Sequence, residues 1–132
     1  ALPEYKFPQI LQGNCLVCSH VYKKEDWEKV GGYNSNMKYC WEDYDFWLSL
    51  IELGREVHQF DEVTFYYRKY DESMISSISH GKLAEMNIQI IKNHIDLYLK
   101  YRVELISALI YIEKKFALEK VAQTQAQAQA VS

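Results

Sequence analysis

The stretch YCWEDYDFWLSL, Tyr39 to Leu50, sets three carboxylates among large aromatic side chains near the middle of the chain. Glu42, Asp43 and Asp45 lie close together, where like charges repel and burial disfavours the charged form. Two explanations fit this crowding: an acidic helix start, or a carboxylate held at the mouth of a pocket for chemistry. The aromatic neighbours are Trp41, Tyr44, Phe46 and Trp47.

The same stretch predicts a helix from about residue 41 to residue 53, closed by Gly54, because its apolar residues recur at three- and four-residue spacing. Glu42 and Asp43 fall in the first turn, where unpaired N–H groups and the helix dipole favour ionised carboxylates. Trp47 follows Asp43 by four residues and shares its face. A rigid helix would then hold Asp43 at a pocket rim, as a general base requires. Acid-rich helix starts are more often structural, so the residues alone leave both explanations open.

The segments on either side of this helix predict an α+β fold. Residues 14–22, NCLVCSHVY, are apolar and rich in strand-forming side chains. A short helix follows and stops at Gly31-Gly32. Residues 55–60 and 62–70 predict two further short strands, the second of which alternates in side-chain character.

The C-terminal third predicts helices, because no proline or glycine interrupts it from Lys82 to Val121. Asn93-His94 marks an expected break between a shorter and a longer helix. The apolar surface of the longer helix is wide, which favours packing on the α/β part, with a dimer or membrane-surface contact as alternatives. A low-complexity tail follows, as frayed helix or disorder. The expected divisions are therefore 1–79, 80–122 and 123–132.

Composition limits the class of protein. A chain of 132 residues can bury a sizeable core, and its net charge of −3, without a basic stripe, gives no reason to expect nucleic acid as a partner. The longest apolar run, Leu105–Ile112, is far shorter than the roughly 20 residues of a bilayer span. No signal peptide is visible, and because the sequence opens on Ala1 we expect that an N-terminal piece is missing.

The three cysteines do not resemble a secreted disulfide framework. Cys15, Cys18 and His20 invite a zinc or redox interpretation. In a strand, however, residues three apart point to opposite faces, and no second cysteine pair completes a tetrahedral site. We therefore expect buried structural cysteines.

The order of features from Asn14 to Met74 resembles the C-terminal half of the catalytic domain of family 2 glycosyltransferases. These are inverting enzymes of the GT-A fold that use nucleotide-activated sugars. The matching pieces are NCLVCSHVYKK, WEKVGGYN, WEDYDFWLSLIELG and REVHQFDEVTFYYRKYDESM. The resemblance is weak over residues 1–13 and nearly absent after residue 80. It implies a partial GT-A-like domain, a short mixed sheet with two helices, followed by a long helical region.

The resemblance also implies roles for individual residues. Asp43 matches the catalytic base, which takes the proton of an acceptor hydroxyl as that oxygen attacks the anomeric carbon with inversion. Neighbouring acids would orient the acceptor or the base, and the glycine pair would let the backbone approach the sugar closely. The residues assigned to the substrate are Glu42, Asp45, Trp41, Gly31 and Gly32.

Two departures from the family concern the metal. The family's Asp-x-Asp motif, which holds a divalent metal, has no match upstream of Asn14. The string from Asp43 to Asp45 fits that motif in letters but lies within the predicted helix, so it is rejected as a metal site. Magnesium or manganese is therefore expected only in the full-length enzyme, and no cofactor or metal ligand is assigned to this chain. Tyr70 stands where many relatives carry a histidine, sometimes near the metal. Arg68 matches the family's Tyr-Arg motif, for which a structural ion pair with a nearby acid is at least as good an explanation as a substrate contact.

The expected function is part of a glycosyltransferase that moves a sugar from a nucleotide-sugar donor to a glycan or lipid-linked acceptor. The absence of Gln-x-x-Arg-Trp from the sequence favours single addition over processive synthesis. The resemblance places the enzyme in bacterial cell-surface polysaccharide biosynthesis, in the cytoplasm or at the inner face of the membrane, and the isolated fragment is expected to be inactive. The alternative is a non-catalytic carbohydrate- or protein-binding module that dimerises through its C-terminal helices.

Overall fold

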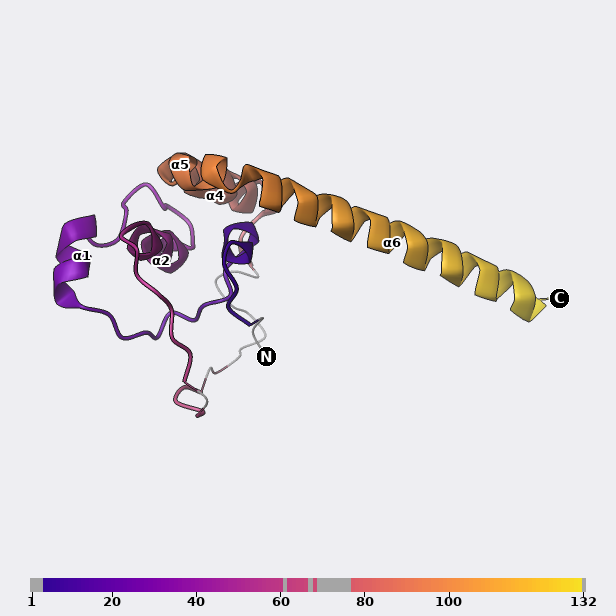
Figure 1. Cartoon of the computed structure of the whole chain (residues 1–132), viewed down its shortest axis with the longest axis horizontal. Coiled ribbons are helices and arrows are strands. Elements are labelled where there is room, and N and C mark those ends of the chain that lie inside the picture. The colour runs from indigo at the N-terminus through magenta and orange to yellow at the C-terminus, as the bar shows by residue number, and fades with distance from the viewer. Residues whose placement is uncertain (1–3, 61, 67, 69–76, 132) are drawn as a thin grey trace. The chain divides into compact units, whose positions relative to one another are not determined.

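The computed structural model describes residues 4–60, 62–66, 68 and 77–131. Contacts divide the chain into two compact units, residues 1–100 and residues 101–132. The domain boundaries expected at residues 79 and 122 stay predictions. The elements follow one another as η1 (Gln9–Gln12), α1 (Lys24–Val30), α2 (Glu42–Glu52), α4 (His80–Asn93), α5 (Ile95–Lys100) and α6 (Arg102–Val131) (Figure 1).

Helix α2 contributes more buried side chains than any other described element of the first unit. It begins at Glu42 and ends at Glu52, and Gly54 beyond it takes a positive φ of 78°. The helix predicted over residues 41–53 is therefore confirmed. Phe46 and Leu48 are 0% exposed, so α2 is covered on more than one face.

Segments from both sides of the sequence cover α2. Ile10 of η1 and Ile90 of α4 are each 1% exposed. The hydroxyl of Tyr44 donates to the carbonyl oxygen of Ile10. The hydroxyl of Tyr98 in α5 donates to the carbonyl oxygen of Leu11 at 2.7 Å. Burying an apolar side chain of this size contributes about 1.5–3 kcal/mol to stability. This burial and the two hydrogen bonds hold the N-terminal segment against the helices.

Helix α1 packs beside α2 and ends as the sequence predicts. Gly31 adopts the left-handed conformation and its N–H bonds to carbonyl oxygens of the last turn. Val30 packs against a buried cluster of α2. The cluster consists of Phe46, Trp47 and Leu50.

The expected α+β fold with a short mixed sheet is wrong, because every regular element in the described part of the chain is a helix. Residues 14–22 and 55–60 contain no strand. Neither do residues 62–66 and 68, while the rest of the expected third strand lies outside the described residues.

The prediction was wrong because strand propensity depends mainly on packing against neighbouring strands and is not an intrinsic preference of the backbone. A strand satisfies its N–H and C=O groups only by pairing, and none of the three described segments pairs with another. Several of their apolar side chains stay in solvent: Val21 is 96% exposed, Phe60 72% and Tyr66 87%.

The helical C-terminal region is confirmed, including the break at Asn93-His94. Helix α4 begins after Ser79, whose hydroxyl accepts from the N–H of Lys82 at 3.5 Å. Helix α5 ends at Lys100, so the longer predicted helix has a further break that the sequence did not indicate. The low-complexity tail continues α6 as helix to Val131.

Helix α6 forms the second unit. Many of its apolar side chains are exposed, among them Ile106, Leu109, Phe116 and Leu118. No helix within the described residues combines the length and the apolar character that crossing a membrane demands.

Candidate functional site

Asp43 lies half-buried in the first turn of α2. Its Oδ1 accepts a hydrogen bond from the backbone N–H of Tyr44 at 2.7 Å. Burial raises the pKa of Asp43, the Tyr44 N–H offsets part of that rise, and the charge of Glu42 adds to it. The helix start therefore compensates only partly for burial, and Asp43 binds a proton more readily than a free aspartate does.

Trp41 precedes the helix in an unusual backbone conformation. Its φ of 63° and ψ of 24° lie in the left-handed region, which costs a residue with a side chain about 1–2 kcal/mol. The turn at Trp41 leads directly into Glu42 and Asp43. Strained residues of this kind cluster at functional sites, so the strain draws attention to the start of α2.

Aromatic rings gather on the neighbouring face of α2. Phe46 meets Tyr22 edge-on at 5.0 Å between ring centroids and Tyr33 at 5.3 Å. The imidazole of His20 lies 4.6 Å from the ring of Trp47. The extended segment before α1 and the loop after it thus both place aromatic side chains against α2.

The two acids at the start of α2 act electrostatically on Tyr33. Burial raises the pKa of Tyr33, and the charges of Tyr22, Asp43 and Glu42 raise it further. Tyr33 and Tyr22 are 53% and 40% exposed, so both rings stay open to solvent. A half-buried acid beside partly exposed aromatic rings is an arrangement that can receive a hydroxylated molecule.

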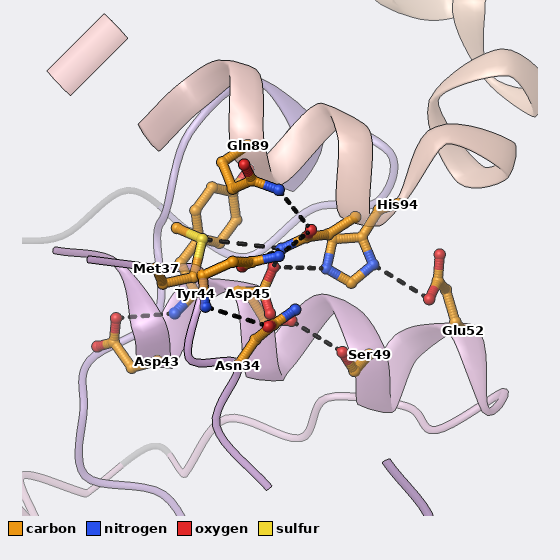
Figure 2. Close-up of polar contacts among 11 residues, drawn as sticks. Asn34, Met37, Asp43, Tyr44, Asp45, Ser49, Glu52, Gln89 and His94 are labelled. Carbon is orange, nitrogen blue, oxygen red and sulfur yellow. Dashed lines mark hydrogen bonds and ion pairs between the residues drawn. The ribbon is translucent and has the colours of Figure 1, made fainter. Parts of the chain in front are cut away.

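Asp45 occupies a different environment from Asp43. It is 2% exposed, and its Oδ1 accepts a hydrogen bond from Asn93 Nδ2 at 2.6 Å and lies 3.2 Å from His94 Nε2 (Figure 2). His94 Nδ1 lies 3.1 Å from Glu52 Oε2. These contacts give Asp45 a structural role between α2 and the end of α4, and its assigned contact with a substrate stays a prediction.

Asn93 and His94 were noted in the sequence only as a helix break. Asn93 also exchanges two side-chain hydrogen bonds with Asn36, at 2.9 and 3.1 Å. Burial lowers the pKa of His94, but the hydrogen bonds and charges of Asp45 and Glu52 outweigh burial and raise it. No local pattern indicates these contacts, which join residues 42 to 57 positions apart.

The two glycines assigned to substrate binding have local structural functions. Gly31 caps α1 with a φ of 78°. Gly32 has a φ of 72°, and a Cβ there would lie 2.9 Å from Cζ2 of Trp27. Both positions therefore favour glycine whether or not a sugar approaches them.

The described residues do not fit a metal site, since no group of three or more His, Cys, Asp or Glu side chains among them is arranged to hold an ion. The three cysteines are free thiols. Of the two cysteines expected to be buried, Cys18 is exposed, so the expectation is wrong there, and Cys15 is half-buried; Cys40 is buried. Burial raises the pKa of the half-buried Cys15, which lowers its thiolate fraction. Tyr70 lies outside the described residues.

Comparison of the chain with family models, with curated proteins and with solved structures finds no match. The resemblance to family 2 glycosyltransferases therefore stays a prediction from the sequence motifs.

Proposed function

We propose that this chain carries the acceptor side of an inverting glycosyltransferase, with Asp43 as the general base. The observation that favours this function is the half-buried position of Asp43, where burial raises its pKa on a rigid helix beside aromatic rings. A base with a raised pKa is better matched to proton transfer near neutral pH than a free aspartate.

In the proposed reaction, the carboxylate of Asp43 takes the proton of an acceptor hydroxyl. The acceptor oxygen forms a bond to the anomeric carbon of the donor sugar. The bond from that carbon to the diphosphate breaks, and the nucleoside diphosphate leaves with the bonding electron pair. Attack from the face opposite the leaving group inverts the configuration.

The neighbours of Asp43 support this role in different ways. The charge of Glu42 raises the pKa of Asp43, and Trp41 turns the chain into the first helical turn. Asp45 acts at a distance: its contacts with Asn93 and His94 hold α2 in place.

The proposed donor is a nucleotide sugar and the proposed acceptor is a glycan or a lipid-linked sugar, in bacterial cell-surface polysaccharide biosynthesis on the cytoplasmic side of the membrane. The resemblance assigns the diphosphate and a magnesium or manganese ion to the other half of the domain. No step is assigned to a metal held by this chain. We accordingly expect the isolated 132 residues to be inactive.

The test uses the full-length protein and a panel of nucleotide sugars, with release of the nucleoside diphosphate as the readout. Asp43→Asn should reduce turnover by about 10²–10⁴-fold, the usual contribution of a general base, while helix content is unchanged. Glu113→Gln, an exposed acid of α6, is the matched control and should retain full turnover. Full activity of Asp43→Asn would show that Asp43 is not the general base.

Helix α6 supports a second candidate function, that of a self-association module. Ile106, Leu109 and Phe116 are 55%, 50% and 66% exposed, and large exposed apolar groups mark interaction surfaces. A homodimer through α6 predicts twice the chain mass by light scattering, and Leu109→Glu with Phe116→Glu should return the mass to that of one chain. A peripheral membrane contact predicts instead that the protein sediments with lipid vesicles.

A further inference from the structure

A pocket of about 230 Å³ lies beside α2. Its walls come from Trp47 of α2, from residues between Leu16 and Lys23, and from the segment that begins at Arg55. Asp43 is not one of its lining residues. The pocket is therefore distinct from the proposed base, and its use as a binding site does not depend on glycosyl transfer.

Two residues that line this pocket each carry a buried ring nitrogen without a hydrogen-bond partner among the described residues. These nitrogens are Nε1 of Trp47 and Nδ1 of His20, which belong to rings only 4.6 Å apart. Leaving a buried polar group unpaired costs about 1–3 kcal/mol, so such atoms call for an explanation. The Trp47 N–H is a donor only, whereas the imidazole nitrogen can donate or accept depending on its tautomer.

The charges that line the pocket cancel. Asp26 accepts hydrogen bonds from Nε and Nη2 of Arg55 at 2.8 and 2.7 Å. Lys23 and Glu56 complete the set, which gives two cationic and two anionic side chains. Because no sign dominates, the lining favours a neutral ligand over a phosphate or a carboxylate.

The size and the surfaces of the pocket indicate one small ring. Its volume is below the roughly 300–1,000 Å³ of pockets that hold drug-sized ligands. Tyr22 and Trp47 supply aromatic surface, which suits the apolar C–H groups of a sugar, while hydroxyl groups can both accept and donate. We propose that this pocket binds a neutral monosaccharide, with a sugar hydroxyl accepting from Trp47 Nε1 and another pairing with His20 Nδ1.

Binding requires a local displacement, since both nitrogens are covered in the free chain. Residues 14–23 lie against Trp47 through His20 and Tyr22 and contain no helix or strand, so we expect this segment to be the part that moves. The displacement would uncover the Trp47 N–H while α2 itself stays in place.

The test is a nuclear magnetic resonance titration of the ¹⁵N-labelled chain with D-glucose, D-galactose and D-mannose, each added separately. The three tryptophans give three indole N–H signals, and the signal missing from Trp47→Phe identifies Trp47. We expect at least one sugar to move the Trp47 signal in a saturable way. Trp47→Phe keeps an aromatic ring but no donor, and should weaken that sugar's binding about tenfold or more, followed through the amide signals.

Trp27→Phe is the matched control, because Trp27 does not line the pocket, and its dissociation constant should equal that of the natural chain. His20→Phe should also weaken binding, because it retains the ring but loses the nitrogen. The proposal is overturned if no sugar moves the Trp47 signal, if inorganic phosphate moves it and the sugars do not, or if Trp47→Phe binds sugar with unchanged affinity. Should Trp47→Phe fail to fold, the titration of the natural chain, with its signals assigned through the backbone, decides the question alone.

Discussion

His94 Nε2 lies 3.2 Å from Oδ1 of Asp45, and both side chains are only 3% exposed. The contact joins the residue after α4 to the first turns of α2 (Figure 2). Asn93 donates a second hydrogen bond to the same oxygen at 2.6 Å. A buried carboxylate is costly unless it is paired and hydrogen-bonded, so this pair sets how α4 packs on α2.

Replacing His94 by alanine should strongly destabilise the fold. Asp45 would keep the Asn93 bond but lose its only cationic partner among the described residues, and breaking a buried pair from one side costs about 3–5 kcal/mol. Urea unfolding followed by circular dichroism measures the change. His58→Ala is the control: that side chain is 86% exposed, so its removal should change stability by less than about 0.5 kcal/mol. Equal stabilities of the two variants would show that the buried pair does not hold α4.

The same contact predicts that stability falls as pH rises. The folded state raises the pKa of His94, so the stabilisation by its charged form is complete below the unfolded-state pKa of about 6.5. It is lost as pH rises through the folded-state pKa. The free energy of unfolding of the natural chain should therefore decrease, relative to that of His94→Gln, as pH rises above about 6.5. Parallel pH curves for the two proteins would contradict a charged His94.

Helix α2 was predictable because its information is local. Apolar residues at helical spacing, acids in the first turn and Gly54 after the end all lie within one short stretch, and the structure places the helix there. The same holds for α1 and its stop at Gly31. The sequence could not indicate which acid would be fully buried. Asp43 and Asp45 are both acids near the start of the same helix, but the helical geometry turns Asp45 toward His94.

The sheet was mispredicted because a strand is not a local property. Residues 14–22 have strand-like composition, yet their backbone pairs with no other described segment. The ion pair between Asp26 and Arg55 was missed for a related reason, since it joins residues 29 positions apart. Long-range pairing depends on the whole fold. A single sequence does not show which distant residues become neighbours in that fold.

Asp43→Asn should stabilise the fold even as it removes the proposed catalytic base. Burial makes the ionised carboxylate unfavourable in the folded state, and the neutral amide of similar shape can still accept from the Tyr44 N–H. The folded-state pKa is raised, so the penalty is absent at low pH, where the carboxyl is protonated, and present at neutral pH. The urea midpoint of Asp43→Asn should accordingly exceed that of the natural chain at neutral pH and approach it in acid.

Asp96→Asn provides the control for that measurement, because Asp96 is also a first-turn acid but is exposed on α5. Its substitution removes a favourable interaction with the helix dipole and should lower the midpoint slightly. A lower midpoint for Asp43→Asn as well would mean that the helix start, and not burial, decides the ionisation of Asp43.

Gly32→Ala should destabilise the turn after α1. The new Cβ would lie 2.9 Å from Cζ2 of Trp27, and the φ of 72° adds about 1–2 kcal/mol of backbone strain for a residue with a side chain. Gly81→Ala is the matched control, since Gly81 lies within α4 with open space around it, and alanine there should stabilise by about 0.5–1 kcal/mol. Opposite signs of the two urea midpoint shifts are expected. If Gly32→Ala were as stable as the natural chain, the packing of Trp27 on the turn would not explain this glycine, and the close approach of a sugar would become the better reason for it.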